Sequence, residues 1–594
     1  MARSLAPTPP TLAEARAVLH ARFGFADLRP AQVQAVQSVL EGHDTLIVLA
    51  TGGGKSICYQ LPALVLDGLT VVISPLIALM RDQVDALERK DIPAAFINST
   101  LTSAQAGERI ARAASGDLRL LYLAPERADV GRTIEQLARI GVTRLAVDEA
   151  HCISEWGHDF RPSYRRIGRL RERLGAPPTV ALTATATPDV RRDIVAQLGL
   201  NDPTVIVAGF DRTNLHYRVR SERTHRDKDR ALIETLRERP GTAVVYAPTR
   251  KATERLATVL TRARIPAVAY HAGLEDASRN RAQDAFMREE ARVVVATSAF
   301  GMGIDKADVR TVVHWAMPGT LEAYYQEAGR AGRDGAPAAC VLLHSYPDRF
   351  THEHFIEQAH PPRRLYEQTW RVLKRRADDV GLTSLTPESL ASLLPDDTNP
   401  RHAVVVIQQL QRRGLVTVIP EHLDRLWVRL LATPERITRE LATDRTLERD
   451  LLRALWRQAA ERLHTGAIIA LDRLPPGLGH PVALRGHLKR LEQEQFIWTR
   501  AVGAGIAIGA DVLPAESPPL DWADLDARRR HDLDKLDWMQ RYAYARICRR
   551  RFVLDYFGDK SFAGCSGCDV CDPPGDAASP ARPRSRPRAR SRTA

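Results

Sequence analysis

The sequence predicts a multidomain α/β protein: two tandem parallel-sheet domains, a helical accessory region with winged-helix-like units, and a helix followed by a four-cysteine zinc module. Three observations predict this architecture. The chain has 594 residues, which is too long for one hydrophobic core. Short apolar runs alternate with amphipathic helical stretches from Asp44 to about Leu343. Four of the seven cysteines lie between residues 548 and 571.

The two α/β domains follow from apolar runs such as "DTLIVLA", "TVVIS", "TAVVYA" and "RVVVATS". Continuous apolar strands separated by helices indicate parallel sheets that are covered on both faces. There are too many such runs for one small sheet, and a break near residues 201–214 divides them. We therefore expect one α/β domain over residues 1–205 and a second over residues 206–354.

The accessory region is expected over residues 355–524, where helices with Arg-rich faces replace the strands. Two stretches, 402–431 and 481–510, share a layout of an amphipathic helix, a polar turn and two strand-like segments, which is the pattern of a winged helix. The second stretch is either a repeat of the first or an unrelated helix and hairpin. Their low identity leaves both interpretations open.

The cysteine cluster predicts a structural zinc site within a module over residues 525–572. Two successive C-x-x-C units in "CSGCDVC" put three thiolates on one side of a tight turn. A fourth cysteine, on a long helix expected over about 525–557, completes a tetrahedron. Four protein ligands leave no open position for water, so the metal has a structural role. The expected ligands are Cys548, Cys565, Cys568 and Cys571.

Charge and composition narrow the class of partner. Lys plus Arg exceeds Asp plus Glu by 85 − 72 = 13, which favours a polyanionic partner without identifying it. Residues 573–594 form a basic tail that has too few apolar residues to fold, and is either a non-specific nucleic-acid contact or a solubilising end. The sequence contains no long apolar window and no secretory signal, so we expect a cytoplasmic protein without a membrane partner.

A glycine-rich loop, "VLATGGGKS", follows the first apolar strand and predicts a phosphate site. Successive glycines let backbone N–H groups converge on phosphate oxygens, Lys55 reaches the terminal phosphates, and Ser56 offers a hydroxyl to Mg²⁺. A strict P-loop has another glycine where this chain has Leu49, so the loop alone also fits a structural turn. The expected nucleotide-binding residues here are Thr51, Gly52, Gly53, Gly54, Lys55 and Ser56.

Two carboxylates end the apolar strand in "RLAVDEAH". A hard cation bound to phosphates prefers oxygen ligands, so Asp148 is expected to hold Mg²⁺ directly or through water. Glu149 is then placed to orient or deprotonate the attacking water. Acidic residues at a strand end can also be a solvated cap, but their occurrence together with the Lys-Ser loop favours catalysis.

The segment "YYQEAGRAGRDG" carries the cations that hydrolysis needs on the far side of the γ-phosphate. Arg330 and Arg333 are three residues apart, about one helical turn, so we expect both to face the same way. They become arginine fingers if the second α/β domain closes on the first. Gln326 is expected to touch the phosphate or the water. A solvated Arg-rich helix is the alternative, against which the three glycines argue.

The chain resembles a RecQ-type DNA helicase of superfamily 2 over about residues 20–350 and again over 525–573. The stretches "FGFADLRPAQ", "TGGGKSICYQLPAL", "SPLIALMRDQV", "DEAHCISEWGHDFRPSY", "LTATAT", "YHAGL", "ATSAFGMGIDKADVR" and "YYQEAGRAGRDG" occur in the order typical of that family. The resemblance implies that the two sheet domains are RecA-like, and the shortened glycine loop is also the family's own.

The resemblance implies ATP-driven 3′ to 5′ translocation on single-stranded DNA that separates duplexes in recombination and repair, at the bacterial nucleoid. Single-stranded and branched DNA are the implied partners, with a single-stranded-DNA-binding protein as a further one. Phe25, Arg29 and Gln32 match residues that contact adenine, and an aromatic face with an amide suits a planar base. Asp305 is expected at the nucleotide cleft between the domains.

The stretch "CISEWGHDFRPSY" resembles the family's aromatic-rich loop, which senses DNA and relays its presence to the ATP site. Trp156 and Phe160 offer stacking surfaces for unpaired bases, Arg161 a phosphate or base-plane contact, and His158 a polar link towards the nucleotide. Aromatic residues beside charges can also be the edge of a core, but their position directly after Glu149 favours coupling.

The chain departs from the usual bacterial layout, because the accessory region precedes the zinc module instead of following it. We expect the zinc module to fold back onto residues 200–350, and no residue is assigned to strand separation. Three other functions stay open: a translocase on duplex DNA, an RNA helicase, and an interaction protein with an inactive ATPase. The presence of Lys55, Asp148, Glu149 and Arg333 argues against the last of these.

Overall fold

The computed structural model describes residues 10–573 except 51, 76, 130, 158–159, 301–305, 396–398, 420–424, 472–473, 476–477, 479–480, 561, 563 and 566. The expected site residues Thr51, His158 and Asp305 and nearly all of the basic tail therefore lie outside the described residues. The chain forms two compact units, one of residues 1–352 with 533–594, and one of residues 353–532. Each unit is described by itself.

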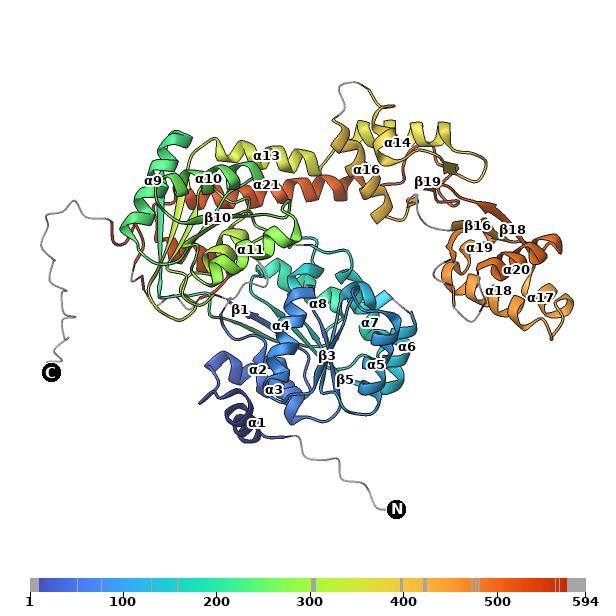
Figure 1. Cartoon of the computed structure of the whole chain (residues 1–594), viewed down its shortest axis with the longest axis horizontal. Coiled ribbons are helices and arrows are strands. Elements are labelled where there is room, and N and C mark those ends of the chain that lie inside the picture. Colours follow the sequence, from blue (N-terminus) through green and yellow to red (C-terminus); the bar gives the residue numbers. More distant parts are fainter. Residues whose placement is uncertain are drawn as a thin grey trace, which may run out of the picture. The chain divides into compact units, whose positions relative to one another are not determined.

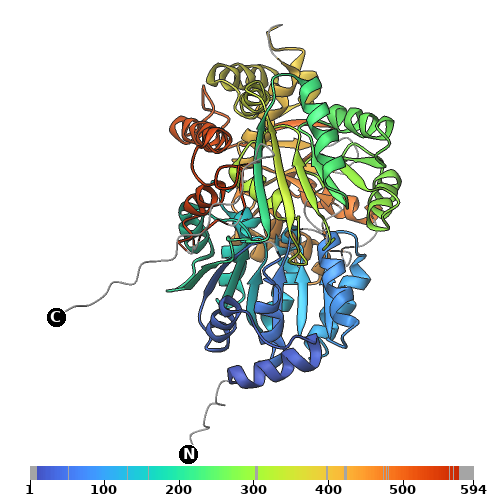
Figure 2. The same ribbon diagram turned by 90° about the vertical axis from the view of Figure 1, so that its left-hand side faces the viewer.

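The first unit contains two fully parallel sheets with helices against their faces (Figures 1 and 2). The seven-stranded sheet has the order β3-β4-β2-β5-β6-β1-β7 and belongs to the first lobe, residues 10–208. The six-stranded sheet has the order β10-β11-β9-β12-β13-β8 and belongs to the second lobe, residues 215–344. The predicted pair of parallel-sheet domains is thus confirmed. Among the described helices, none is long and apolar enough to cross a membrane.

The elements of the first lobe alternate as the apolar pattern predicts, and strands such as β1, β2 and β6 are buried along their whole length because helices cover both faces. The strands are β1 Thr45–Leu49, β2 Leu69–Ile73, β3 Ala94–Ile97, β4 Leu120–Leu123, β5 Val142–Val147, β6 Thr179–Thr183 and β7 Thr204–Ala208. The helices are α1 Leu12–Val18, α2 Pro30–Leu40, α3 Ile57–Val65, α4 Ile77–Glu88, α5 Ser103–Ala114, α6 Gly131–Ile140, α7 Ile167–Arg173 and α8 Pro188–Leu198.

The second lobe repeats this alternation. Helices α9, α10 and α12 begin at threonine caps, and Thr224, Thr249 and Thr320 each accept a hydrogen bond from a backbone N–H of the first turn. The strands are β8 Leu215–Ser221, β9 Ala243–Tyr246, β10 Ala267–Tyr270, β11 Val293–Ala296, β12 Thr311–His314 and β13 Ala338–His344. The helices are α9 His225–Glu238, α10 Arg250–Arg262, α11 Asp276–Met287 and α12 Leu321–Ala328.

The accessory unit contains two small antiparallel sheets, ordered β14-β19-β15 and β17-β16-β18. Its strands are β14 Leu382–Thr383, β15 Val416–Ile419, β16 Arg425–Leu430, β17 Ala467–Ala470, β18 Ile497–Ala501 and β19 Gly505–Ile508. Its helices are α14 Arg363–Arg376, α15 Pro387–Ala391, α16 Pro400–Arg412, α17 Pro434–Glu440, α18 Thr446–Ala459, α19 Arg462–Thr465 and α20 Pro481–Gln493.

The two stretches with the winged-helix pattern exchange strands. Each has the expected helix and two strands, but the expected hairpin within each stretch is wrong. Instead β15 pairs with β19, and β16 pairs with β18. Each sheet therefore takes one strand from each stretch. The sheets share an apolar contact that includes Ile419, Trp427 and Ala507, so burial of side chains distant in sequence decides the pairing.

The accessory unit is inserted between two helices that lie side by side, α13 (Asp348–Ala359) and α21 (Trp522–Tyr544) (Figure 1). Arg349 on α13 forms an ion pair of 2.6 Å with Asp537 on α21. Farther along the same pair of segments, His360, just after α13, lies 2.7 Å from Asp532 on α21. These contacts show that the helices are antiparallel. The unusual placement of the accessory region therefore reflects an insertion into a helical hairpin.

The long helix expected over about 525–557 is two helices, α21 and α22 (Arg549–Phe557). Cys548 is the N-cap of α22 and has an extended ψ of 124°, so the chain bends at Cys548, the first of the four clustered cysteines. Ile547 lies between the two helices and is 52% exposed. The helical spacing of apolar residues did not reveal this bend.

Candidate functional site

The glycine loop connects the buried strand β1 to α3 in the first lobe. Gly52 and Gly54 have φ values of +80° and +72°, which side chains rarely adopt. A Cβ at Gly54 would lie 2.4 Å from Nε2 of Gln32, so the loop also needs glycine for space. Lys55 Nζ donates to the Leu49 carbonyl at 3.3 Å. The loop thus has a backbone conformation that favours glycine and carries a lysine, as phosphate binding requires.

Two of the residues expected to contact adenine hold this loop in the structure. Gln32 Nε2 donates to the carbonyls of Gly53 and Gly54 at 3.1 Å each. Arg29 Nη1 donates to the Gly52 carbonyl at 2.9 Å. Phe25 is 56% exposed, which leaves its ring available to a planar partner. Arg29 and Gln32 therefore position the glycine loop, a role that the sequence did not indicate.

The two carboxylates follow β5 at the same sheet edge. Asp148 Oδ1 accepts a hydrogen bond of 2.9 Å from the backbone N–H of Glu149. Burial, and then the neighbouring Glu149, raise the pKa of Asp148, while the charge of Lys55 opposes this shift. Glu149 adopts the left-handed conformation with φ 47° and ψ 45°. Such backbone strain and a buried carboxylate are typical of functional sites.

His151 links these acids to the next strand and was not among the expected site residues. Its Nδ1 lies 3.3 Å from Oε2 of Glu149 and 2.8 Å from Oγ1 of Thr183, at the end of β6. The side chain is 1% exposed. Thr183 begins "TATAT", and its hydroxyl therefore contacts the acidic segment through a buried imidazole. The position of His151 directly after "DEA" is the signal that could have identified it.

The arginines of the second lobe do not share one helical turn as expected. α12 ends at Ala328, and Arg330 is only 6% exposed and hydrogen-bonds Tyr246 inside its own lobe. Arg333 lies at the glycine loop, because a Cβ at Gly52 would come within 3.9 Å of its Cγ. The turn after α12 therefore separates the two side chains. Gln326 lies on α12 and is partly buried.

Arg212, on the segment between the lobes, holds the turn that carries Arg333. Its Nη2 donates to the carbonyls of Gly332 at 2.7 Å and Ala331 at 3.0 Å, and its Nη1 to Gly329 at 3.3 Å. Asn214 adds a hydrogen bond of 2.8 Å to Gly332. Sequence reasoning missed Arg212 because its partners are more than a hundred residues away.

The aromatic-rich segment follows the acids in the first lobe. Trp156 and Phe160 are both partly exposed, as residues that stack on bases must be. Arg161 Nη1 donates to the Pro75 carbonyl at 2.9 Å, and the backbone N–H of Trp156 donates to Ser154 Oγ at 3.2 Å. The loop is therefore held by main-chain contacts to its own lobe while its aromatic rings remain partly accessible.

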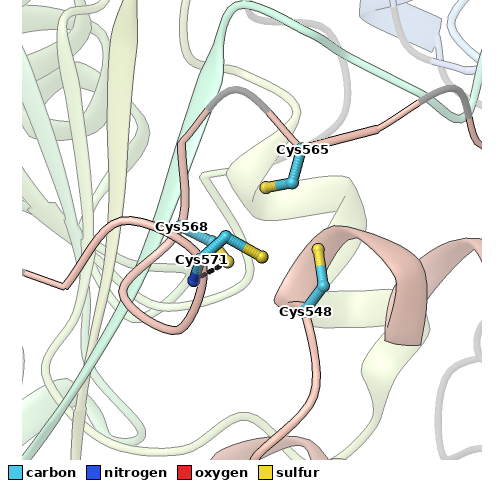
Figure 3. Close-up of side chains that lie close together, drawn as sticks. All are labelled: Cys548, Cys565, Cys568 and Cys571. Atoms are coloured by element: carbon cyan, nitrogen blue, oxygen red, sulfur yellow. Dashed lines mark hydrogen bonds between the residues drawn. The ribbon is translucent and has the colours of Figure 1, made fainter. Parts of the chain in front are cut away.

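The four cysteines come together as expected, and their sulfur atoms point toward one another (Figure 3). The four Sγ atoms all lie within 4.8 Å of one another. Tetrahedral Zn²⁺ with Zn–S bonds of about 2.3 Å places sulfur atoms about 3.8 Å apart, so the donor set and its spacing suit zinc. The backbone N–H of Cys571 also donates to the sulfur of Cys568 at 3.4 Å.

The cysteine loop lies on the edge strand of the second lobe, which confirms that the zinc module folds back onto residues 200–350. Cys568 forms a parallel bridge with Tyr217 of β8, and the N–H of Asp569 donates to the Tyr217 carbonyl at 3.0 Å. Asp569 in turn accepts from the N–H of Val219 at 2.9 Å and pairs with Arg549 at 2.9 Å. The loop therefore covers the open edge of the six-stranded sheet.

Helix α22 contacts the segment between the lobes and the first lobe as well. Arg550, with a side chain 2% exposed, lies 2.5 Å from Asp211 and donates to the Leu215 carbonyl at 3.0 Å. Arg191 of α8 donates to the Phe557 carbonyl at 2.6 Å. The ring of Phe557 stacks on Phe210 with centroids 4.7 Å apart. The zinc module therefore packs against the segment that connects the lobes.

Three family models match the chain. Residues 29–194 match "DEAD/DEAH box helicase", residues 227–335 match "Helicase conserved C-terminal domain", and residues 516–572 match "RecQ zinc-binding". The first two cover the lobes with the glycine loop and the arginines, and the third covers α21, α22 and the cysteines.

Curated relatives share this combination. The chain is 47% identical to the ATP-dependent DNA helicase RecQ of Bacillus subtilis over 351 residues, 59% of each protein. It is 43% identical to the RecQ helicase of Pasteurella multocida, covering 59% of this chain and 55% of that one. It is 39% identical to the probable ATP-dependent DNA helicase RecS of B. subtilis, covering 63% of this chain and 77% of that one.

Proposed function

Because this chain belongs to the RecQ family of superfamily 2 helicases, we propose that it is an ATP-dependent DNA helicase. It translocates 3′ to 5′ on single-stranded DNA and separates duplexes in recombination and repair. The chain spans between about half and two thirds of the first two curated relatives, so this activity is inferred for the part that matches. The observation that carries it is the approach of Arg333 in the second lobe to Gly52 in the glycine loop.

In the proposed reaction the first lobe binds ATP and Mg²⁺. The N–H groups from Thr51 to Ser56 and the ammonium of Lys55 hold the phosphates, and Ser56 and Asp148 hold the cation. A bound cation would also offset the burial of Asp148, because an ionised buried carboxylate needs a positive partner. The adenine stacks on Phe25, while Arg29 and Gln32 contact its edge and keep the loop in place.

Hydrolysis uses groups from both lobes. Glu149 orients the water and accepts its proton. The buried His151 holds the Glu149 carboxylate and connects it to Thr183. Arg333 stabilises the charge on the γ-phosphate, a contribution that is about 10³- to 10⁵-fold in related phosphoryl transfers. Arg330 supports the same segment from within its lobe. Gln326 and Asp305 are assigned to the cleft on their position in the family pattern alone.

DNA binding and its coupling to hydrolysis are assigned to the aromatic-rich segment. Trp156 and Phe160 stack on unpaired bases, Arg161 contacts a phosphate, and His158 links the segment to the nucleotide. Zn²⁺ has a structural role in the cysteine loop. The expected partners are single-stranded and branched DNA with a single-stranded-DNA-binding protein, in the bacterial cytoplasm at the nucleoid.

One set of assays tests the function. ATP hydrolysis is measured with oligothymidine, duplex DNA and RNA, and unwinding is measured on duplexes with a 3′ or a 5′ tail. We expect stimulation by oligothymidine and unwinding from the 3′ tail. Stimulation without strand separation would instead identify a translocase, and preference for RNA would identify an RNA helicase.

The phosphate site is tested by Lys55→Ala, with the exposed Lys251→Ala on α10 as the matched control. Loss of a preorganised donor at a developing charge costs about 10²- to 10³-fold in rate, so Lys55→Ala should reduce hydrolysis by at least that factor. Lys251→Ala should hydrolyse ATP at the normal rate. Equal rates for both variants would show that Lys55 does not bind the phosphates.

A further inference from the structure

A lysine buried on the zinc module contacts both lobes. Lys535 lies on α21 and is 4% exposed. Its Nζ donates to the main-chain carbonyl of Trp156 at 2.5 Å, in the aromatic-rich segment of the first lobe. The same Nζ lies 3.9 Å from Oε1 of Glu322, in the first turn of α12. One ammonium group therefore joins three elements that are distant in sequence.

Each partner of Lys535 belongs to a segment that carries, or continues into, residues of the proposed reaction. Trp156 belongs to the segment that follows Asp148 and Glu149. Glu322 begins the helix that ends just before the turn with Arg330 and Arg333. Glu322 is 3% exposed and also accepts a hydrogen bond from Tyr556 of α22. Both ends of the contact are thus buried and enclosed by the zinc module.

The contact is not explained by stability. Burying an ammonium and a carboxylate carries a large desolvation cost, and well-packed apolar residues in their place are often as stabilising or more so. The zinc module is also held by the Arg550–Asp211 pair and by the hydrogen bond that the backbone N–H of Val219 donates to Asp569. Tyr542 adds a hydrogen bond of 3.0 Å to Tyr324. These contacts attach the module without Lys535, so the ammonium has another role.

We propose that Lys535 is a positioning residue that couples nucleic-acid binding at the aromatic-rich segment to the arginine-bearing turn after α12. The proposal rests on the proposed function, because it assumes that single-stranded DNA stimulates hydrolysis. Lys535 holds the backbone of Trp156 and leaves the indole ring to stack on bases. An ammonium in a buried site must keep its acceptors. When bases move the Trp156 backbone, Lys535 and Glu322 therefore move with it.

The test uses two variants. Lys535→Met keeps the length of the side chain and removes the charge, but leaves Glu322 as a buried carboxylate without its ammonium. The double variant Lys535→Met with Glu322→Gln removes both charges. We expect Lys535→Met to lower the thermal midpoint and the double variant to recover it. In both variants the stimulation by oligothymidine falls about 10-fold, within the usual range for coupled sites.

Two readouts separate positioning from a general structural effect. Basal hydrolysis and the KM for ATP should remain within about twofold of the unaltered protein, because Lys535 contacts neither nucleotide nor phosphate loop. Lys560→Met, an exposed lysine of the same module, is the matched control and should keep full stimulation. Lys535→Arg keeps the charge and the donors and should recover part of the stimulation.

The outcomes distinguish failure of the proposed helicase function from failure of the role proposed for Lys535. If oligothymidine does not stimulate the unaltered protein, the proposed function fails. If it does, and the folded double variant is stimulated normally, the role of Lys535 is refuted. Hydrogen exchange on the unaltered protein gives a second test that needs no variant. Oligothymidine should change exchange in residues 154–157 and in α12 together, and a change confined to 154–157 overturns the inference.

Discussion

Replacing Arg212 by alanine tests how the segment between the lobes controls hydrolysis. Arg212 donates to the carbonyls of Gly329, Ala331 and Gly332, which form the turn before Arg333. The substitution removes all three hydrogen bonds and leaves Asn214 as a remaining support of the turn. The position of the turn relative to the glycine loop is then less well fixed, because fewer hydrogen bonds hold the turn.

The expected loss follows from these contacts. Hydrogen bonds to a charged group contribute about 1.5–3 kcal/mol each, but Arg212 is partly exposed and water can replace it, so we take about 1 kcal/mol per bond. Three bonds give about 3 kcal/mol, which corresponds to about 10²-fold in kcat at 1.36 kcal/mol for each factor of ten. The loss should stay below that of removing an arginine finger itself, about 10³-fold or more.

The assay is steady-state ATP hydrolysis at saturating oligothymidine. The kcat should fall about 10²-fold. The affinity for ATP should change less than kcat, because Lys55 is untouched, although a Cβ at Gly52 would lie 3.7 Å from Nη1 of Arg212. Arg212→Lys keeps the charge without the planar fork, so its kcat should lie between those of Arg212→Ala and the unaltered protein. Arg226→Ala, on the exposed face of α9, is the control. A folded Arg212→Ala protein with kcat within twofold of the unaltered protein would refute the reasoning.

Two further predictions concern the zinc module and the accessory unit. Cys568→Ala should lose the zinc ion of the cysteine cluster and lower the unfolding temperature, because zinc binding contributes about 10–16 kcal/mol in small modules. Cys340→Ala is the control and should keep the metal. One zinc ion per chain retained in Cys568→Ala would contradict the ligand set. Gly466→Ala should destabilise the accessory unit by about 3 kcal/mol, because its φ is +109° and the new Cβ would lie 1.8 Å from Cζ2 of Trp427. The free energy of unfolding is measured by chemical denaturation followed by tryptophan fluorescence. Gly486→Ala, where the new Cβ on α20 meets open space, is the control. Equal stability of the two variants would contradict the predicted clash with Trp427.

The local parts of the site could be read from the sequence because their chemistry is local. The phosphate loop needs small residues and a lysine at neighbouring positions, and Asp148 with Glu149 ends a strand that its apolar run already predicts. The cysteine ligands are close in sequence except for Cys548. In each case a few adjacent residues carry the whole pattern, so the structure mainly adds distances and burial.

Most of the contacts that sequence reasoning missed join residues that are far apart in the chain. His151 is the exception, because it follows Glu149 by two residues and contacts it. Arg212 and Lys535 look like ordinary charged residues on a linker and a helix, and only their partners show what they contact. Arg29 and Gln32 are expected near a base, and the structure adds that they hold carbonyls of the glycine loop. Arg330 and Arg333 were expected on one helical turn, and the end of α12 at Ala328 separates them.

The accessory unit shows the same limit at the level of strands. The helices and strands of both winged-helix-like stretches lie where the apolar pattern places them. Their pairing does not follow the chain, because a strand offers the same hydrogen-bonding groups to any neighbour and side-chain burial selects the partner. Trp427 and Ala507 are far apart in sequence and share one apolar contact, which no local pattern contains.

The sequence by itself determined the two parallel-sheet domains, the glycine loop, the acidic pair and three of the four cysteines of the cluster, because neighbouring residues and short apolar runs encode them. Only the tertiary structure decided that strands are exchanged in the accessory unit, that the zinc loop covers β8, and that Lys535 joins Trp156 to Glu322. Those features depend on which surfaces are buried together when the chain folds, and burial is a property of the whole fold.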